Sequence, residues 1–153
     1  MDLPVPIKYS LDEILSQLTL TGPPVLPRKV LFWGEGAGEI SSYIAGWMAG
    51  QGIDVIVLDG ANRFDPYHLV REARARGLAP RETLSRVRVA RAFTCHQLVR
   101  LLSESLPSHL KPGSLVLVLG PVSLFYDEQV PLSERRRLFK DLTRLLTTIK
   151  AQA

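Results

Sequence analysis

Short apolar segments alternate with segments of helical periodicity along most of this chain, and this alternation constrains the fold more than any other feature. The apolar segments predict strands over Lys29 to Trp33, Ile53 to Leu58, Val87 to Ala92 and Leu115 to Leu119. The second of these is almost entirely β-branched and apolar, which is typical of a strand that is covered on both faces. Strands separated by helical segments indicate βαβ units, so we expect an α/β domain with a mainly parallel sheet and helices on both sides.

Helices are expected between these strands and at both ends of the chain. Ser10 begins an S-x-x-E capping box, and apolar residues at helical spacing follow it. Further helices are predicted over 41–50, 66–76 and 95–106. The last helix is expected to begin after Pro131, and its apolar face is made of Leu138, Leu142, Leu145, Leu146 and Ile149.

Length and composition fit a single globular domain. The chain has 153 residues, of which 46% are hydrophobic and 22% are charged. We expect one domain over 1–153, with a helical lead-in over 1–28 and a core over 29–153. No apolar run approaches the roughly 18 residues of a membrane helix, and the first residues do not resemble a signal peptide. We therefore expect a cytoplasmic protein with no membrane partner.

The composition also excludes some kinds of site. Cys95 is the one cysteine, so it cannot form an internal disulfide. The three histidines are scattered along the chain, and a metal site cannot be assembled from them. No residues form a convincing nucleophile and base pair. We therefore expect no metal site and assign no catalytic residue.

Arginine is concentrated in the middle of the chain. The segment 63–100 contains nine arginines and three acidic residues, whereas the whole chain has a net charge of +4. Arginine suits phosphate contacts because its planar fork donates two hydrogen bonds at once. Three further arginines follow Pro131, near a helix N-terminus, where cations oppose the helix dipole. Our candidate DNA or phosphate contacts are Arg88, Arg91, Arg135, Arg136 and Arg137. The alternative interpretation is that these arginines lie on solvated surfaces.

The turn after the first expected strand is rich in glycine. It comprises Gly34, Glu35, Gly36, Ala37, Gly38, Glu39, Ile40 and Ser41. A glycine turn between a strand and a helix can bind phosphate, because backbone N–H groups converge there. A working P-loop also needs a lysine for the phosphates and a hydroxyl for magnesium. When Gly38 is taken as the second P-loop glycine, Glu39 replaces the lysine and Ile40 replaces the hydroxyl.

This exchange of a cation for an anion opposes ATP binding. At about 4 Å and an effective dielectric constant near 20, each charge–phosphate interaction is on the order of 4 kcal/mol. We therefore expect no cofactor; ATP with magnesium would bind only if the chain were an ATPase with a non-standard P-loop.

A damaged dinucleotide fingerprint is another interpretation of the glycine turn. In it, glycine is missing at position 39 and Asp59 stands where a ribose ligand would be.

Several segments resemble RecA/RadA-type recombinases. Residues 58–66 have the acidic residue, short turn and F-x-P signature that follow the second core strand of that family. Residues 87–98 carry its A-R-A-F…H-Q-L pattern. Residues 115–126 are similar to its Walker B strand, and 132–135 match the start of the following helix. The resemblance covers roughly residues 10–148 and implies a RecA-like three-layer αβα domain with a mainly parallel central sheet.

The same resemblance implies that three catalytic groups are missing. The P-loop lysine falls on Glu39, the catalytic glutamate on Ala61 and the Walker B aspartate on Gly120. Phosphoryl transfer depends on positioning and charge neutralisation, so little activity should be left. We expect a non-catalytic RecA-like binding or regulatory module linked to DNA recombination or repair. Its partners would be a RecA-fold protein, a second copy of itself or DNA. The alternative is a nucleotide-binding ATPase with a non-standard P-loop, in which arginines replace the lysine.

Overall fold

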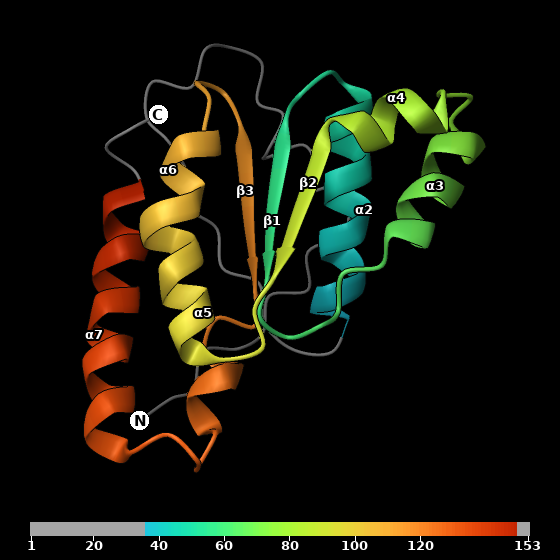
Figure 1. The fold of residues 1–153 in the computed structure, drawn as a ribbon. Helices are drawn as coiled ribbons and strands as arrows, with labels where there is room; N and C mark the ends of the chain where they lie inside the picture. The colour runs from blue at the N-terminus through green and yellow to red at the C-terminus, as the bar shows by residue number, and fades with distance from the viewer. Residues whose placement is uncertain (1–35, 150–153) are drawn as a thin grey trace, which may run out of the picture. The chain divides into compact units, whose positions relative to one another are not determined.

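The computed structural model describes residues 36–149, which lie within one compact unit, Leu31–Ala153. Three parallel strands form a sheet in the order β2-β1-β3, and they are β1 (Val55–Asp59), β2 (Val87–Arg91) and β3 (Leu115–Leu119) (Figure 1). The expected α/β class and parallel sheet are confirmed. The helix expected after Ser10 and the strand expected over 29–33 lie outside the described residues.

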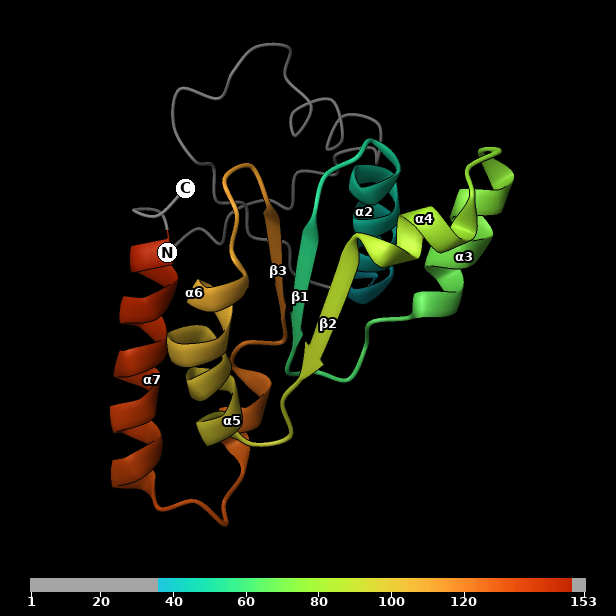
Figure 2. The ribbon, with the colours of Figure 1, turned by 45° about the horizontal axis from the view of Figure 1, so that its top comes forward.

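Helices cover both faces of the sheet, as two views show (Figures 1 and 2). One face carries α2 (Ala37–Gly50), α3 (Pro66–Ala75) and α4 (Pro80–Ser85). The other carries α5 (Cys95–Arg100), the π-helical turn η1 (Leu101–Ser105), α6 (Leu106–His109) and α7 (Leu132–Thr148). A short 3₁₀ helix, η2 (Ser123–Tyr126), precedes α7. Among the described helices, none combines the length and the apolar character needed to span a bilayer.

Local sequence signals explain where two of the helices begin. The Asp65 side chain caps α3 by accepting a hydrogen bond from Tyr67 N, and Pro66 occupies the first helical position. The Thr94 hydroxyl caps α5 in the same way by accepting from Gln97 N. The predicted starts of both helices are therefore confirmed.

The segment after Cys95 is helical for longer than predicted and changes its hydrogen-bond pattern on the way. The prediction ended at residue 106, but the helix continues to His109 through the π-helical turn. Pro107 has no N–H to donate, and its ring would clash with the carbonyl of Ser103 in a regular α-helix. A π-helical turn before the proline relieves this conflict. The short helix α4 was not predicted at all.

The core lies on both faces of β1. Val55 and Val57 are fully buried on one face, while Ile56 and Leu58 belong to a cluster on the other. That cluster includes Leu142, and Leu138 is also buried, so the predicted apolar face of α7 is confirmed. The first four residues of β3 are only half-buried, because within 36–149 its outer edge pairs with no strand.

The crossovers bring several loops to one edge of the sheet. The connection from β1 to β2 runs through α3 and α4 on one face, and the connection from β2 to β3 runs through α5 and α6 on the other (Figure 1). In such open sheets, ligand sites form at the carboxyl ends of strands where successive connections leave to opposite faces. We call this edge of the sheet the carboxyl edge.

Candidate functional site

Helix α2 begins inside the predicted glycine turn. Gly36 has φ 82°, a left-handed conformation that glycine adopts without strain, and it precedes the first helical residue. Ile40 N donates to Gly36 O (3.0 Å), and the Ser41 hydroxyl donates to Gly38 O. The predicted start of this helix at Ser41 is therefore wrong by four residues, since Gly36 makes the turn and Gly38 does not interrupt the helix. Gly34 and Glu35 lie outside the described residues.

Within the described residues, the first turn of α2 has backbone donors without an acceptor. No side chain caps this helix, and the N–H groups of Ala37, Gly38 and Glu39 have no acceptor within residues 36–149. Such N–H groups, together with the helix dipole, attract an anion. Glu39 places its own negative charge in this turn. The turn therefore has the donors of a phosphate site and a charge that opposes phosphate.

Arg63 is a neighbour of this turn that sequence reasoning did not single out. A Cβ on Gly38 would lie 3.2 Å from the Arg63 Cβ, so the loop after β1 packs directly against α2. The Ser42 hydroxyl strengthens this contact by accepting a hydrogen bond from Asp65 N (3.0 Å). The sequence showed Arg63 only as one of many arginines, because the contact joins segments more than twenty residues apart.

Asp59, at the end of β1, organises the loop that follows. Its side chain is fully buried. The carboxylate accepts hydrogen bonds from the backbone N–H groups of Ala61 (3.1 Å), Arg63 (3.2 Å) and Phe64 (3.0 Å). It also lies 3.5 Å from Arg91 Nε, and Arg91 donates a further bond to Phe64 O (2.9 Å). The geometry thus opposes the dinucleotide interpretation, because Asp59 holds its own loop and has no exposed oxygen for a ribose hydroxyl.

The ends of β1 and β3 pack tightly through two glycines. Gly60 N donates to Leu119 O (2.9 Å), and a Cβ on Gly60 would lie 3.1 Å from Gly120 O. Gly120 has φ 54°, and a Cβ there would lie 2.4 Å from the Ala61 Cβ and 2.9 Å from the Ser123 hydroxyl. The positions that the resemblance assigns to the catalytic glutamate and the Walker B aspartate are therefore direct neighbours. Both are occupied by residues with no side-chain donor or acceptor.

The five candidate arginines do not gather in one place. Arg88 pairs in register with Ile56 and Arg91 with Asp59, so the two point to opposite faces of the sheet. Arg88 is exposed, whereas Arg91 holds the Asp59 loop. The remaining three arginines lie on α7. Arg135 Nη1 donates to Phe125 O (3.1 Å), and Arg137 lies 3.8 Å from Glu134. Arg136 makes no ion pair with the described residues.

Two side chains near the start of α7 have altered proton affinity. His96 Nε2 and Glu134 Oε1 are 2.7 Å apart and connect α5 to α7. This hydrogen bond is the main reason why the pKa of Glu134 lies below its ordinary value. Cys95 is buried in the core, and this burial raises the pKa of its thiol. In the described part of the chain, no three histidine, cysteine or acidic side chains are placed to hold a metal ion.

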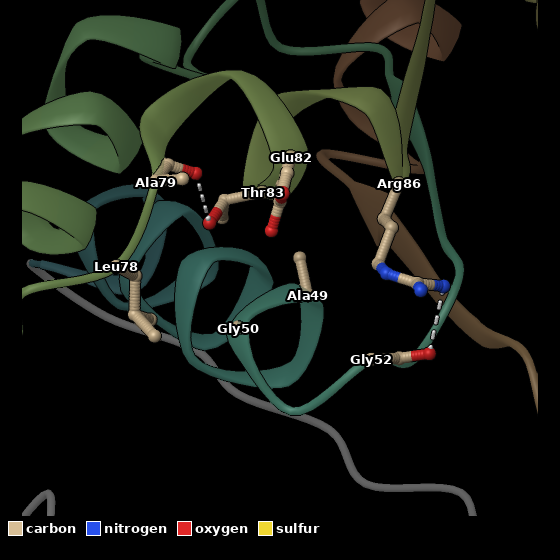
Figure 3. Close-up of a pocket in the computed structure, with 8 residues that line it drawn as sticks. All are labelled: Ala49, Gly50, Gly52, Leu78, Ala79, Glu82, Thr83 and Arg86. Carbon is tan, nitrogen blue, oxygen red and sulfur yellow. Dashed lines mark hydrogen bonds between the residues drawn. The ribbon is translucent and has the colours of Figure 1, made fainter.

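One hollow lies far from the carboxyl edge. It has a volume of about 180 Å³ and is lined by Ala49, Gly50, Gly52, Leu78, Ala79, Glu82, Thr83 and Arg86 (Figure 3). Arg86 Nη1 donates to Gly52 O (3.0 Å), and the Thr83 hydroxyl donates to Ala79 O (3.2 Å). These polar groups are already paired with the protein, so this hollow carries no functional argument.

A second hollow runs along α7. It has a volume of about 340 Å³ and is lined by Phe125, Leu132, Arg135, Arg136, Phe139 and Lys140. We call it the α7 groove. Sequence reasoning had placed three arginines on this helix but had not joined them to the phenylalanines. The spacing of Leu132, Arg136 and Phe139 puts them on one side of a helix, which is the signal that could have found it.

No known protein family has a model that matches this chain. The assignment of function therefore depends on the geometry of the carboxyl edge and of α7.

Proposed function

We propose that this chain is a RecA-like domain that does not hydrolyse ATP and acts as a binding or regulatory module linked to DNA recombination or repair. The observation that carries the proposal is the contact between Ala61 and Gly120 at the carboxyl edge. In an ATPase of this kind, acidic side chains at these positions would orient water and hold magnesium. Here two small residues pack against each other, and an added side chain on Gly120 would overlap Ala61.

The chemistry of the remaining groups supports the same proposal. Hydrolysis of ATP needs charge neutralisation by metal and cations around the transferred phosphoryl group. The carboxylate that ends β1 belongs to Asp59, which is fully buried and engaged by three N–H groups and Arg91. Glu39 adds a negative charge to the first turn of α2, where phosphate would bind.

The arrangement of strands and helices supports the fold named in this proposal. The parallel order β2-β1-β3 and the helices on both faces agree with a RecA-like three-layer αβα domain. The module would act through a partner, which we take to be a RecA-fold protein, a second copy of this chain or DNA.

A nucleotide-binding ATPase with a non-standard P-loop is the second candidate, and one observation favours it. Three N–H groups of the first turn of α2, which have no acceptor within 36–149, lie beside the loop that carries Arg63. Arg63 would then take the place of the missing lysine at the phosphates. This candidate and the non-catalytic one differ in whether ATP binds.

A titration with ATP separates the two candidates. Fluorescent ATP with magnesium is added to the 153-residue protein, and anisotropy is recorded with unlabelled ATP as competitor. We expect no saturable binding at high micromolar protein, because Glu39 repels the phosphates. The Glu39→Lys variant should bind more tightly by about tenfold or more if the free N–H groups accept phosphate. Glu82→Lys is the matched control, since it makes the same charge change on another helix, α4.

The opposite result would favour the ATPase. Saturable, competable binding by the unmodified protein would overturn the loss of the nucleotide site. Turnover that disappears in Arg63→Ala would then assign the phosphate contact to Arg63. Turnover that is unchanged in Arg63→Ala would point to a contaminating ATPase.

DNA contact is a separate part of the proposal and is expected to be electrostatic. Arg88 and Arg136 are the candidate arginines that are exposed and make no ion pair with the described residues, and of these two Arg88 lies outside the α7 groove. Single-stranded oligonucleotides should bind weakly, with an affinity that falls steeply as salt rises. Replacing Arg88 with Glu should lower the slope of log affinity against log salt by about 0.7, as loss of one phosphate contact predicts. If no affinity is measurable at low salt, DNA is removed from the proposal.

A further inference from the structure

The α7 groove has an apolar floor that is open to solvent. Leu132 is 53% exposed and Phe139 is 41% exposed. Phe125 completes the floor and is contributed by η2, which precedes α7 in the chain. Large apolar side chains that gather in an exposed hollow are typical of a surface that binds a partner.

The walls of the groove are positively charged. Arg135, Arg136 and Lys140 line it, and no acidic side chain of the described residues does. The two acidic residues of α7 that lie nearest in sequence are directed to other partners. Glu134 is held by His96 at 2.7 Å, and Asp141 lies 3.3 Å from Arg144. The groove therefore complements a ligand that is negatively charged and apolar at once.

The two phenylalanines favour side chains over nucleobases as the ligand. Their ring centroids are 5.4 Å apart and the rings are nearly perpendicular, at 83°. The edge of one ring meets the face of the other, so the pair does not offer two parallel open faces on which successive bases would stack. Aliphatic and aromatic side chains of a peptide fit such a floor without needing parallel planes.

One donor of Arg135 has no partner in the described part of the chain. Its Nη1 donates to Phe125 O (3.1 Å), but its Nε is buried and has no hydrogen-bond partner among the described residues. A buried donor without a partner is uncommon in proteins. Because Nε is closed to solvent, a carboxylate bound in the groove would pair with this guanidinium through an Nη atom.

We propose that the α7 groove binds an amphipathic acidic segment of a partner protein. Apolar side chains of the segment, spaced along one face of a helix, pack on Leu132 and Phe139, and its flanking carboxylates pair with Arg136 and Lys140. A second copy of this chain is a poorer occupant, because a symmetric pairing of two α7 grooves would bring the same cations face to face. This inference names the kind of partner that the proposed binding module would bind. It depends on the proposed binding role and not on the loss of ATP hydrolysis.

The test uses designed peptides and the whole 153-residue protein. The first peptide is a fluorescent helix of about 15 residues with leucines on one face and glutamates on both flanks. The second has the same sequence with lysine in place of each glutamate. We expect saturable anisotropy for the acidic peptide and at least about tenfold weaker binding for the basic one.

Two protein variants locate the binding. Arg136→Glu should weaken the acidic peptide by about tenfold or more. Arg74→Glu is the matched control, because Arg74 is exposed on α3 and makes no ion pair with the described residues. Phe139→Ala should also weaken binding, and its circular dichroism spectrum and unfolding curve check that the fold is kept. This experiment does not involve ATP, so its failure is distinguishable from a failure of the proposed loss of the nucleotide site.

Four results would overturn the inference. The first is equal binding of the two peptides, and the second is a loss of affinity in Arg74→Glu as large as in Arg136→Glu. The third is a single-stranded oligonucleotide that displaces the acidic peptide and loses affinity in Arg136→Glu, which would assign the groove to nucleic acid. The fourth is a dimer in sedimentation that disappears in both Arg136→Glu and Phe139→Ala, which would assign it to a second copy.

Discussion

Replacing Asp59 with alanine is expected to lower the free energy of unfolding by about 3–5 kcal/mol, the largest effect of any substitution considered for this protein. The carboxylate is fully buried and accepts from three backbone N–H groups. Alanine would leave those donors without an acceptor; the bond from Phe64 N is buried and the other two are part-buried, and a buried unpaired donor costs about 1–3 kcal/mol. It would also release Arg91, whose Nε lies 3.5 Å from the carboxylate.

Urea denaturation followed by circular dichroism measures this effect, and Asp59→Asn is the control. Asparagine keeps the shape and one acceptor oxygen but removes the charge. We expect it to lose roughly half as much stability as alanine does, since one amide oxygen can accept from at most two of the N–H groups. A loss below about 1 kcal/mol in Asp59→Ala would show that the carboxylate does not hold the loop.

Replacing Gly120 with alanine is expected to destabilise the protein by about 3 kcal/mol. Two causes add. The residue has φ 54°, where a side chain costs roughly 1 kcal/mol or more. The new Cβ would also lie 2.4 Å from the Ala61 Cβ, so the ends of β1 and β3 must separate. Overpacking of this kind costs about 1–3 kcal/mol.

Gly113 provides a matched control for the backbone cause. It also has a positive φ of 78°, but a Cβ there would meet nothing within 4 Å. Gly113→Ala should therefore lose about 1 kcal/mol, and the difference between the two variants measures the contact with Ala61. If both variants lose the same free energy of unfolding, the contact between Gly120 and Ala61 does not constrain the structure. The proposed function would then lose the observation that carries it.

The strands illustrate what periodicity can predict. The segment from Ile53 onward was expected to be a strand covered on both faces, and β1 is buried along its whole length. The apolar run at 115–119 was predicted with correct bounds. The start of α3 was predicted correctly at Pro66, and the structure adds that the Asp65 side chain caps this helix.

The wrong or missing predictions concern the start of α2, the helix α4 and the π-helical turn. None of these can be recognised from a short stretch of sequence. The start of α2 was misplaced because the glycines of the turn look alike in sequence, and only their conformations distinguish Gly36 from Gly38. The helix α4 was missed because its six residues have too few apolar positions to show a period. The π-helical turn depends on Pro107, whose effect on a helix varies with how the surrounding chain packs.

The sequence by itself determined the α/β class and the order of the described strands and helices, apart from α4. Those features depend on local periodicity and on residue identity, which are present in any stretch of the chain. Only the tertiary structure decided that Ala61 and Gly120 touch, that Asp59 is closed in by its own loop, and that Phe125 and Phe139 form one floor beneath three cations. These contacts join segments that are distant in sequence, and they exist because parallel strands bring their carboxyl ends together and α7 packs against α5.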